Sequence, residues 1–163
     1  MLAFAQWLAG TPVSIGIQRA LWLIPLLQAV HILAIAMVLS SVAMVDLRIL
    51  GIAGSQTMTE TARRFVPWLW AGLIVLAATG IVLIVGEPKR ALPNPAFQLK
   101  MLLLALAIAM TIAFEGSLRR NRTSWDNGSR RGTVTVVLAV FTFLLWCAIA
   151  VAGRWIAYQQ DVG

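Results

Sequence analysis

The chain has 163 residues, of which 60% are hydrophobic and 12% charged, and its mean hydropathy is +0.86. Because soluble domains carry about 25% charged residues, this composition excludes an ordinary soluble protein and predicts an integral membrane protein. The net charge of +7 comes from arginines that flank apolar segments, which argues against nucleic acid as a partner. The single cysteine, Cys147, excludes an intrachain disulfide and a Cys-x-x-Cys site.

The N-terminal part of the chain predicts a short surface helix followed by the first membrane span. Residues 1–9 are too short to span a bilayer and contain Trp7, which favours a helix lying in the interface. Thr11 followed by Pro12 is a helix-start signal, so we expect the first long helix to begin there. It should cross the bilayer over residues 20–45, with a kink at Pro25.

Proline and glycine mark the limits of the other three spans. Pro67 is expected in the first turn of the second span, Asn94 and Pro95 form a cap and first turn for the third, and Gly116 should end it. Runs of about 20 uncharged residues cross about 30 Å of hydrocarbon as helices and exclude transmembrane β-strands. The sequence therefore predicts a single all-α domain over residues 1–163, a four-helix transmembrane bundle with spans at 20–45, 67–85, 95–114 and 133–157.

Basic residues gather on one side of the predicted bundle. Eight lysines and arginines flank the connections after the first and third spans, against five on the other face, which predicts that both termini lie outside the cytoplasm. The third connection, SLRRNRTSWDNGSRRG, could also bind anionic lipid headgroups through Arg119, Arg120, Arg122, Arg130 and Arg131.

His31 is the only histidine and lies about 11 residues into the first span, so we expect it near the bilayer midplane. Polar groups there are costly and often functional, and a neutral imidazole is a common ligand for haem and other metal centres. Gln28, one turn away on the same face, would help to bind the cofactor. The alternative is a structural histidine, hydrogen-bonded to Gln28 or to a serine or threonine on another helix.

The first span has a second face that favours close packing. Ala29, Ala36 and Ala43 lie opposite His31 at about 100° per residue, and small residues at this spacing allow helices to approach closely. Protein or cofactor is therefore expected on two opposed sides of this helix. A homo-oligomer or an assembly with other membrane subunits would supply it.

Other polar groups give weaker signals. Copper binding by methionine, histidine and cysteine is disfavoured because Met101 and Met110 point to opposite sides of one helix. Methionines that only fill space in the apolar core are the favoured alternative. Lys100, about a turn inside the third helix, is expected to reach back to the membrane surface. No nucleophile and base, carboxylate pair or phosphate loop is present, so an enzyme is not expected.

The segments QAVHILAIAMVLSSVAMVDLRILG and NPAFQLKMLLLALA together resemble small four-helix inner-membrane proteins of bacteria. More distantly, the chain is similar to CopD-like and cytochrome-b-like membrane families. This resemblance implies a bacterial cytoplasmic (inner) membrane, in which the arginine bias described above places both termini in the periplasm. It also implies haem b held by histidines on more than one helix. Only His31 matches here.

Two functional hypotheses follow. The first is a non-catalytic subunit that scaffolds or assembles a membrane protein complex. The second is a haem- or copper-binding protein for electron transfer or metal handling, with His31 as the ligand. A lone histidine could complete bis-histidine haem ligation only across a two-fold axis, with one His31 from each protomer.

Overall fold

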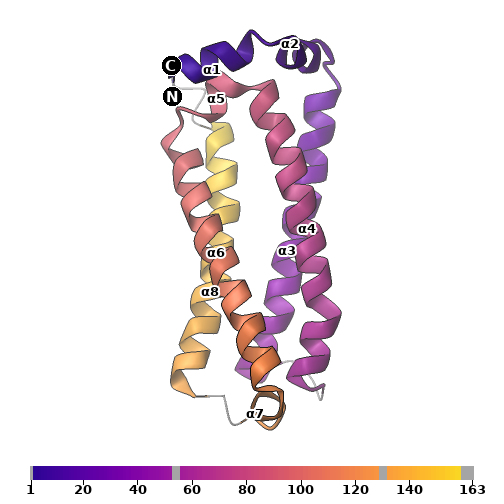
Figure 1. The fold of residues 1–163 in the computed structure, drawn as a ribbon, viewed down its shortest axis with the longest axis vertical. Coiled ribbons are helices and arrows are strands. Elements are labelled where there is room, and N and C mark those ends of the chain that lie inside the picture. Colours follow the sequence, from indigo (N-terminus) through magenta and orange to yellow (C-terminus); the bar gives the residue numbers. More distant parts are fainter. Residues whose placement is uncertain (1, 53–55, 129–131, 159–163) are drawn as a thin grey trace.

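The computed structural model describes residues 2–52, 56–128 and 132–158, and in these residues the secondary structure is entirely helical, with no strand (Figure 1). The helices are α1 (Leu2–Ala9), α2 (Pro12–Arg19), α3 (Leu23–Leu50), α4 (Met58–Gly86), α5 (Pro88–Ala91), α6 (Pro95–Arg120), α7 (Arg122–Asp126) and α8 (Thr133–Tyr158).

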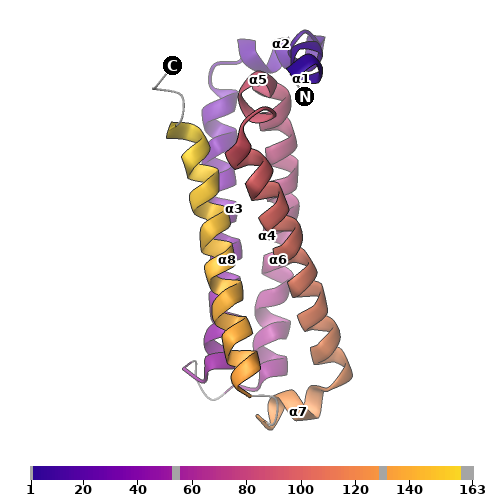
Figure 2. The same cartoon turned by 90° about the vertical axis from the view of Figure 1, so that its left-hand side faces the viewer.

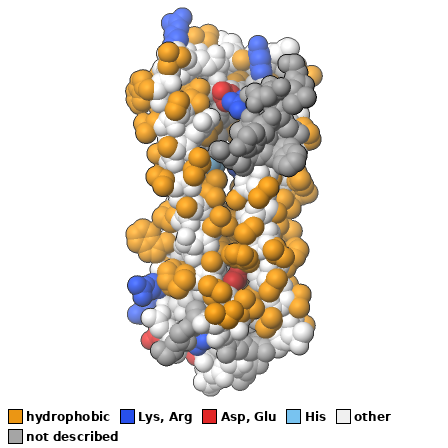
Figure 3. Space-filling view, turned by 180° about the vertical axis from the view of Figure 1, so that it is seen from behind, with side chains coloured by type: hydrophobic (Ala, Val, Ile, Leu, Met, Phe, Trp, Pro, Cys, Tyr) orange, Lys and Arg blue, Asp and Glu red, His pale blue; other side chains and the backbone are white. Residues whose placement is uncertain are grey.

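Four of these helices, α3, α4, α6 and α8, are long and apolar enough to cross a membrane. They run side by side along the long axis of the molecule in both ribbon views (Figures 1 and 2), with α7 at one end and α1, α2 and α5 at the other. Hydrophobic side chains cover most of the face between these two ends (Figure 3). The all-α four-helix bundle is confirmed, and the chain is a multi-pass membrane protein.

The first span differs from its sequence prediction at its start. Thr11 caps α2 as expected, since its hydroxyl oxygen accepts a hydrogen bond from the Ser14 amide, but that helix ends at Arg19 and α3 begins separately at Leu23. Pro25 therefore stands in the first turn of α3, where the amide of a normal residue would have no helical partner. Because Pro25 is not in the interior of α3, it does not interrupt the hydrogen bonds of the helix as the predicted kink required.

The second and third spans are longer than hydropathy predicted. α4 begins nine residues before Pro67, at a capping box in which Thr57 and Glu60 each accept a hydrogen bond from the other's amide. Asn94 caps α6 as predicted, accepting from the Ala96 amide at 2.9 Å. α6 continues past Gly116 to Arg120, because one glycine lowers helix stability by only about 1 kcal/mol.

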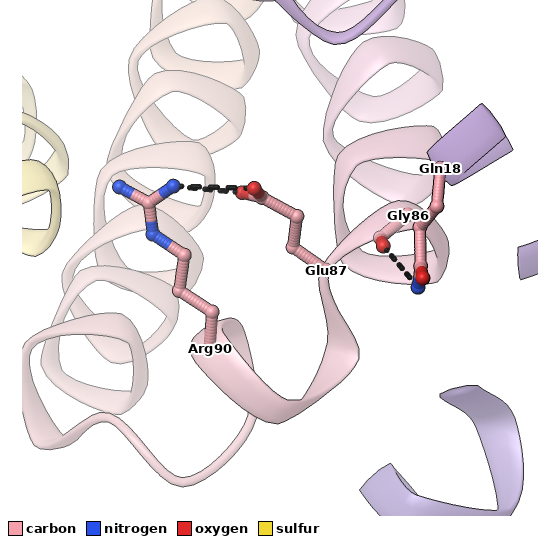
Figure 4. A network of polar contacts seen from close by, with 4 residues as sticks. All are labelled: Gln18, Gly86, Glu87 and Arg90. Atoms are coloured by element: carbon pink, nitrogen blue, oxygen red, sulfur yellow. Dashed lines mark hydrogen bonds and ion pairs between the residues drawn. The ribbon is translucent and has the colours of Figure 1, made fainter. Parts of the chain in front are cut away.

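The α5 end of the bundle is tied together by polar contacts around the start of α5 (Figure 4). The Gln18 side chain of α2 donates to the Gly86 carbonyl at the end of α4, over 2.9 Å. Arg90 forms a salt bridge with Glu87 at 3.0 Å. These contacts hold α2 across the end of α4 and keep the charge of Arg90 paired within the chain.

The apolar core occupies the middle of the bundle and its α7 end. The central cluster contains buried residues from all four long helices, among them Val38, Leu73, Ala107, Trp146 and Ile149. A second cluster nearer α7 includes Val45, Ile49, Met58, Ala62, Leu118 and Ala139. Helix backbones approach closely between α3 and α4, α6 and α8, and α3 and α8. Buried polar residues also lie among these clusters, including Asp46 and Thr61 toward the α7 end.

Candidate functional site

Polar side chains replace the apolar core toward the α5 end of the bundle. His31 precedes buried Ala34 and Val38 on the inward stripe of α3, and Thr79 is buried on α4. Lys100 lies about two and three turns before the buried residues Ala107 and Thr111 on the same side of α6. We call the set His31, Thr79 and Lys100 the polar layer.

The three members of the polar layer lie at a similar depth in the membrane. His31 is eight residues from the start of α3, Thr79 seven from the end of α4, and Lys100 five from the start of α6. At 1.5 Å per residue these are distances of about 12, 10 and 8 Å from the helix ends. His31 therefore lies nearer the α5 end than the expected midplane, because α3 extends to Leu50 and its midpoint falls near Ala36.

The His31 ring is held by a hydrogen bond to another helix. Its Nδ1 atom stands 2.7 Å from Oγ1 of Thr79, and the Thr79 hydroxyl donates its own proton to the Val75 carbonyl at 2.7 Å. In the tautomer that carries its proton on Nδ1, the hydroxyl oxygen accepts from Nδ1–H, and Nε2 of the neutral ring retains its lone pair. Metal-bound histidines usually have their second nitrogen fixed in this way, although the same bond also joins α3 to α4.

The Lys100 side chain extends from α6 toward α8. A Cβ atom on Gly153 of α8 would stand 3.2 Å from its Nζ. The expectation that Lys100 reaches the membrane surface stays a prediction. Its position on the inward side of α6 aims the chain at α8, where Gly153 leaves space for it.

Glycines border two members of the polar layer. A Cβ on Gly80 would lie 3.7 Å from Cε1 of His31, and a Cβ on Gly153 would be in tight contact with the Lys100 side chain. Alanine at position 80 would be tolerated, because 3.7 Å is an ordinary contact distance, whereas position 153 has little room. Gly153 thus belongs to the wall that positions Lys100.

The structure separates several residues that the sequence associated with a site. Gln28 is exposed on α3, while the hydrogen bond of His31 goes to Thr79. Cys147, considered above as a copper ligand, lines a groove between α6 and α8. No group of three histidine, cysteine or acidic side chains converges for a metal within the described residues.

The basic cluster is located at the α7 end. Arg119, Arg120 and Arg122 are exposed there, and Arg119 lies 3.7 Å from Glu115. Arg130 and Arg131 lie outside the described residues.

Sequence reasoning missed the role of Thr79 and the contact of Lys100 with α8. A threonine inside the apolar run of α4 signals a possible partner for a histidine on another helix, but it does not identify which histidine nitrogen it contacts. Both residues acquire their neighbours from the way α4 packs on α3 and α6 packs on α8.

Comparison with known proteins gives one match. The model of a family of unknown function, DUF6644, covers residues 15–159. No curated protein and no solved structure matches the chain.

Proposed function

We propose that this chain, which belongs to the DUF6644 family, is a non-catalytic subunit that scaffolds or assembles a membrane protein complex. The observation that carries the proposal is the unused packing face of α3. Its inward side is occupied by the rest of the bundle, through Val38 and the His31–Thr79 bond. Its opposite side is exposed.

The exposed side of α3 has the composition of a helix interface. Ala29, Leu33, Ala36 and Ser40 lie within about 60° of one another on it and are all exposed. Ala36 and Ser40 have the small-xxx-small spacing that lets helix backbones approach, and the Ser40 hydroxyl is bonded to the Ala36 carbonyl of its own helix at 2.7 Å. A helix from a second copy, or from another subunit, fits this surface.

Replacing Ala36 with leucine should weaken association by about 1 to 3 kcal/mol, because a larger side chain prevents close approach. The stability of the isolated bundle should not fall, since Ala36 is exposed in it. Ala105→Leu, at an exposed position of α6, is the matched control. Native mass spectrometry in mild detergent, with a thermal unfolding measurement, would show both effects. A wild type that is only monomeric and brings no partner with it would contradict the proposal.

The proposal includes the predicted membrane topology, with both termini outside the cytoplasm. The excess of arginine at the α7 end supports a cytoplasmic location for that end and a periplasmic one for the termini, in a bacterial inner membrane. The exposed arginines Arg119, Arg120 and Arg122 then face the leaflet surface where anionic headgroups occur.

A second function, haem b binding, is favoured by the geometry of His31. Fixing Nδ1 on Thr79 leaves Nε2 as the atom that would ligate the iron, and Lys100 supplies a cation for a propionate. Bound haem would supply one-electron transfer. The inward position of His31 does not fit a haem shared between two protomers, so ligation within one chain is the version that the residues allow.

Purified protein should show a Soret band if this second function is correct, and His31→Ala should abolish it because the iron loses its protein ligand. Thr79→Val is the matched variant: it retains His31 and removes only the orienting hydroxyl, so it should lower haem affinity by about tenfold to a hundredfold. An optical titration of apoprotein with haemin measures both. A folded wild type without a Soret band, even after haemin is added, would exclude haem and leave the subunit proposal unaffected.

A further inference from the structure

Lys100 differs from Arg90 and Lys89, two other cations near the α5 end, in its ionic partners and its exposure. Arg90 is paired with Glu87, and Lys89 is exposed. Lys100 is half-buried on the inward side of α6, within the length of a membrane-spanning helix. A lone ammonium at this depth is costly unless an anion meets it.

The described acidic side chains are all engaged or distant. Glu60 and Glu87 are bonded to Thr57 and Arg90, while Glu115 and Asp126 contact residues at the α7 end. Asp46 is buried four residues before the α7 end of α3. Within residues 2–52, 56–128 and 132–153, therefore, no carboxylate is paired with Lys100.

A groove lies between α6 and α8 near the level of Lys100, which is not itself one of its lining residues. It has a volume of about 480 Å³ and is lined by Ala96, Leu99 and Leu103 of α6 and by Cys147, Ala148, Val151 and Ala152 of α8. Leu99 and Ala152 are the sequence neighbours of Lys100 and Gly153, so the groove and the ammonium are at the same level of the bundle. Small side chains on both helices create the hollow, and its walls are apolar.

We propose that an anionic phospholipid binds between α6 and α8, with its phosphate at Lys100 and an acyl chain in the groove. Charge complementarity selects the head, because Lys100 lies five residues after the start of α6, about 8 Å from the α5 end of that helix. The apolar walls select the tail. This site is independent of the subunit proposal, which uses neither the groove nor Lys100, whereas the haem alternative shares Lys100 with it.

The test compares phosphatidylglycerol with phosphatidylcholine. The protein is equilibrated with an equimolar mixture in mild detergent, and retained lipids are counted by native mass spectrometry. Wild type should retain phosphatidylglycerol about tenfold more than phosphatidylcholine, the ratio expected from one charge-assisted contact. Lys100→Gln should abolish this preference and Lys100→Arg should retain most of it. Lys89→Gln removes an exposed cation near the same end and should have no effect.

Filling the groove tests the tail separately from the head. Ala152→Leu should lower retention of both lipids severalfold with Lys100 intact, because leucine occupies the space of the acyl chain. Ala113→Leu, at an exposed position elsewhere on α6, is its control.

Thermal stability in nanodiscs separates lipid binding from a purely structural role of Lys100. In phosphatidylcholine, Lys100→Gln should unfold at the same temperature as wild type or higher, since it removes a buried charge. Adding phosphatidylglycerol should raise the unfolding temperature of wild type and leave that of Lys100→Gln unchanged.

Three results would overturn the proposal. One is a wild type without lipid preference, and another is a preference that survives in Lys100→Gln. The third is loss of the preference in Asp161→Asn together with lower stability in phosphatidylcholine, because the partner of Lys100 would then belong to the chain itself. Asp161 lies outside the described residues. The oligomeric state of Lys100→Gln should match that of wild type. Failure of the lipid-binding proposal would therefore not affect the subunit proposal.

Discussion

Gly72→Val should destabilise the bundle by about 1 to 3 kcal/mol, because it places a branched side chain where α3 and α4 are in direct contact. A Cβ at Gly72 would stand 2.6 Å from Cγ2 of Val38, 3.1 Å from Cε of Met37 and 3.4 Å from the Ala34 carbonyl oxygen. The terminal methyl of Met37 can move, but the Ala34 backbone and the buried Val38 cannot. Unfolding in mixed micelles of increasing SDS content would measure the change.

Gly116→Ala is the control for the helical role of glycine. It lies inside α6, and no atom is within 4 Å of an added Cβ, so alanine should stabilise the protein by up to about 1 kcal/mol. Equal stability of Gly72→Val and wild type would show that α3 and α4 are farther apart than described. It would also call the His31–Thr79 bond into question, because both contacts depend on the same helix pair.

Asp126→Ala should destabilise the α7 end by about 1 to 3 kcal/mol. The carboxylate of Asp126 accepts two hydrogen bonds from Thr59, one from its backbone amide and one from its hydroxyl, each 2.9 Å long. The Thr59 amide is in the first turn of α4 and has no helical partner, and a carboxylate there also interacts favourably with the helix dipole. Removing Asp126 loses both effects and detaches α7 from α4.

A double-mutant cycle with Thr59→Val would isolate the hydroxyl contact, because valine retains the backbone amide. Asn127→Ala, at the exposed neighbouring position, should change stability by less than about 0.5 kcal/mol. Hydrogen exchange at the first turn of α4 is a second measurement, and protection there should fall in Asp126→Ala alone. Unchanged protection would mean that Asp126 does not cap α4.

The sequence by itself determined the class of the fold and the number of spans. Long uncharged runs force helices in a bilayer, since every backbone amide must find a partner within its own segment. Local caps were also readable: Thr11 and Asn94 stand where their side chains accept bonds from amides a few residues away. Hydropathy located the apolar part of each helix but not its ends, so the start of α4 at Met58 was missed.

Only the tertiary structure decided which polar groups meet. The sequence marked His31 as unusual but left its partner open among residues on its own and other helices. Packing of α4 against α3 selected Thr79 and left Gln28 exposed. Likewise, the sequence left the neighbours of Lys100 open, and the space at Gly153 of α8 receives its side chain. The physical reason is that helical periodicity fixes only the relative directions of side chains on one helix, whereas the rotation of each helix in the bundle depends on contacts between residues far apart in the sequence.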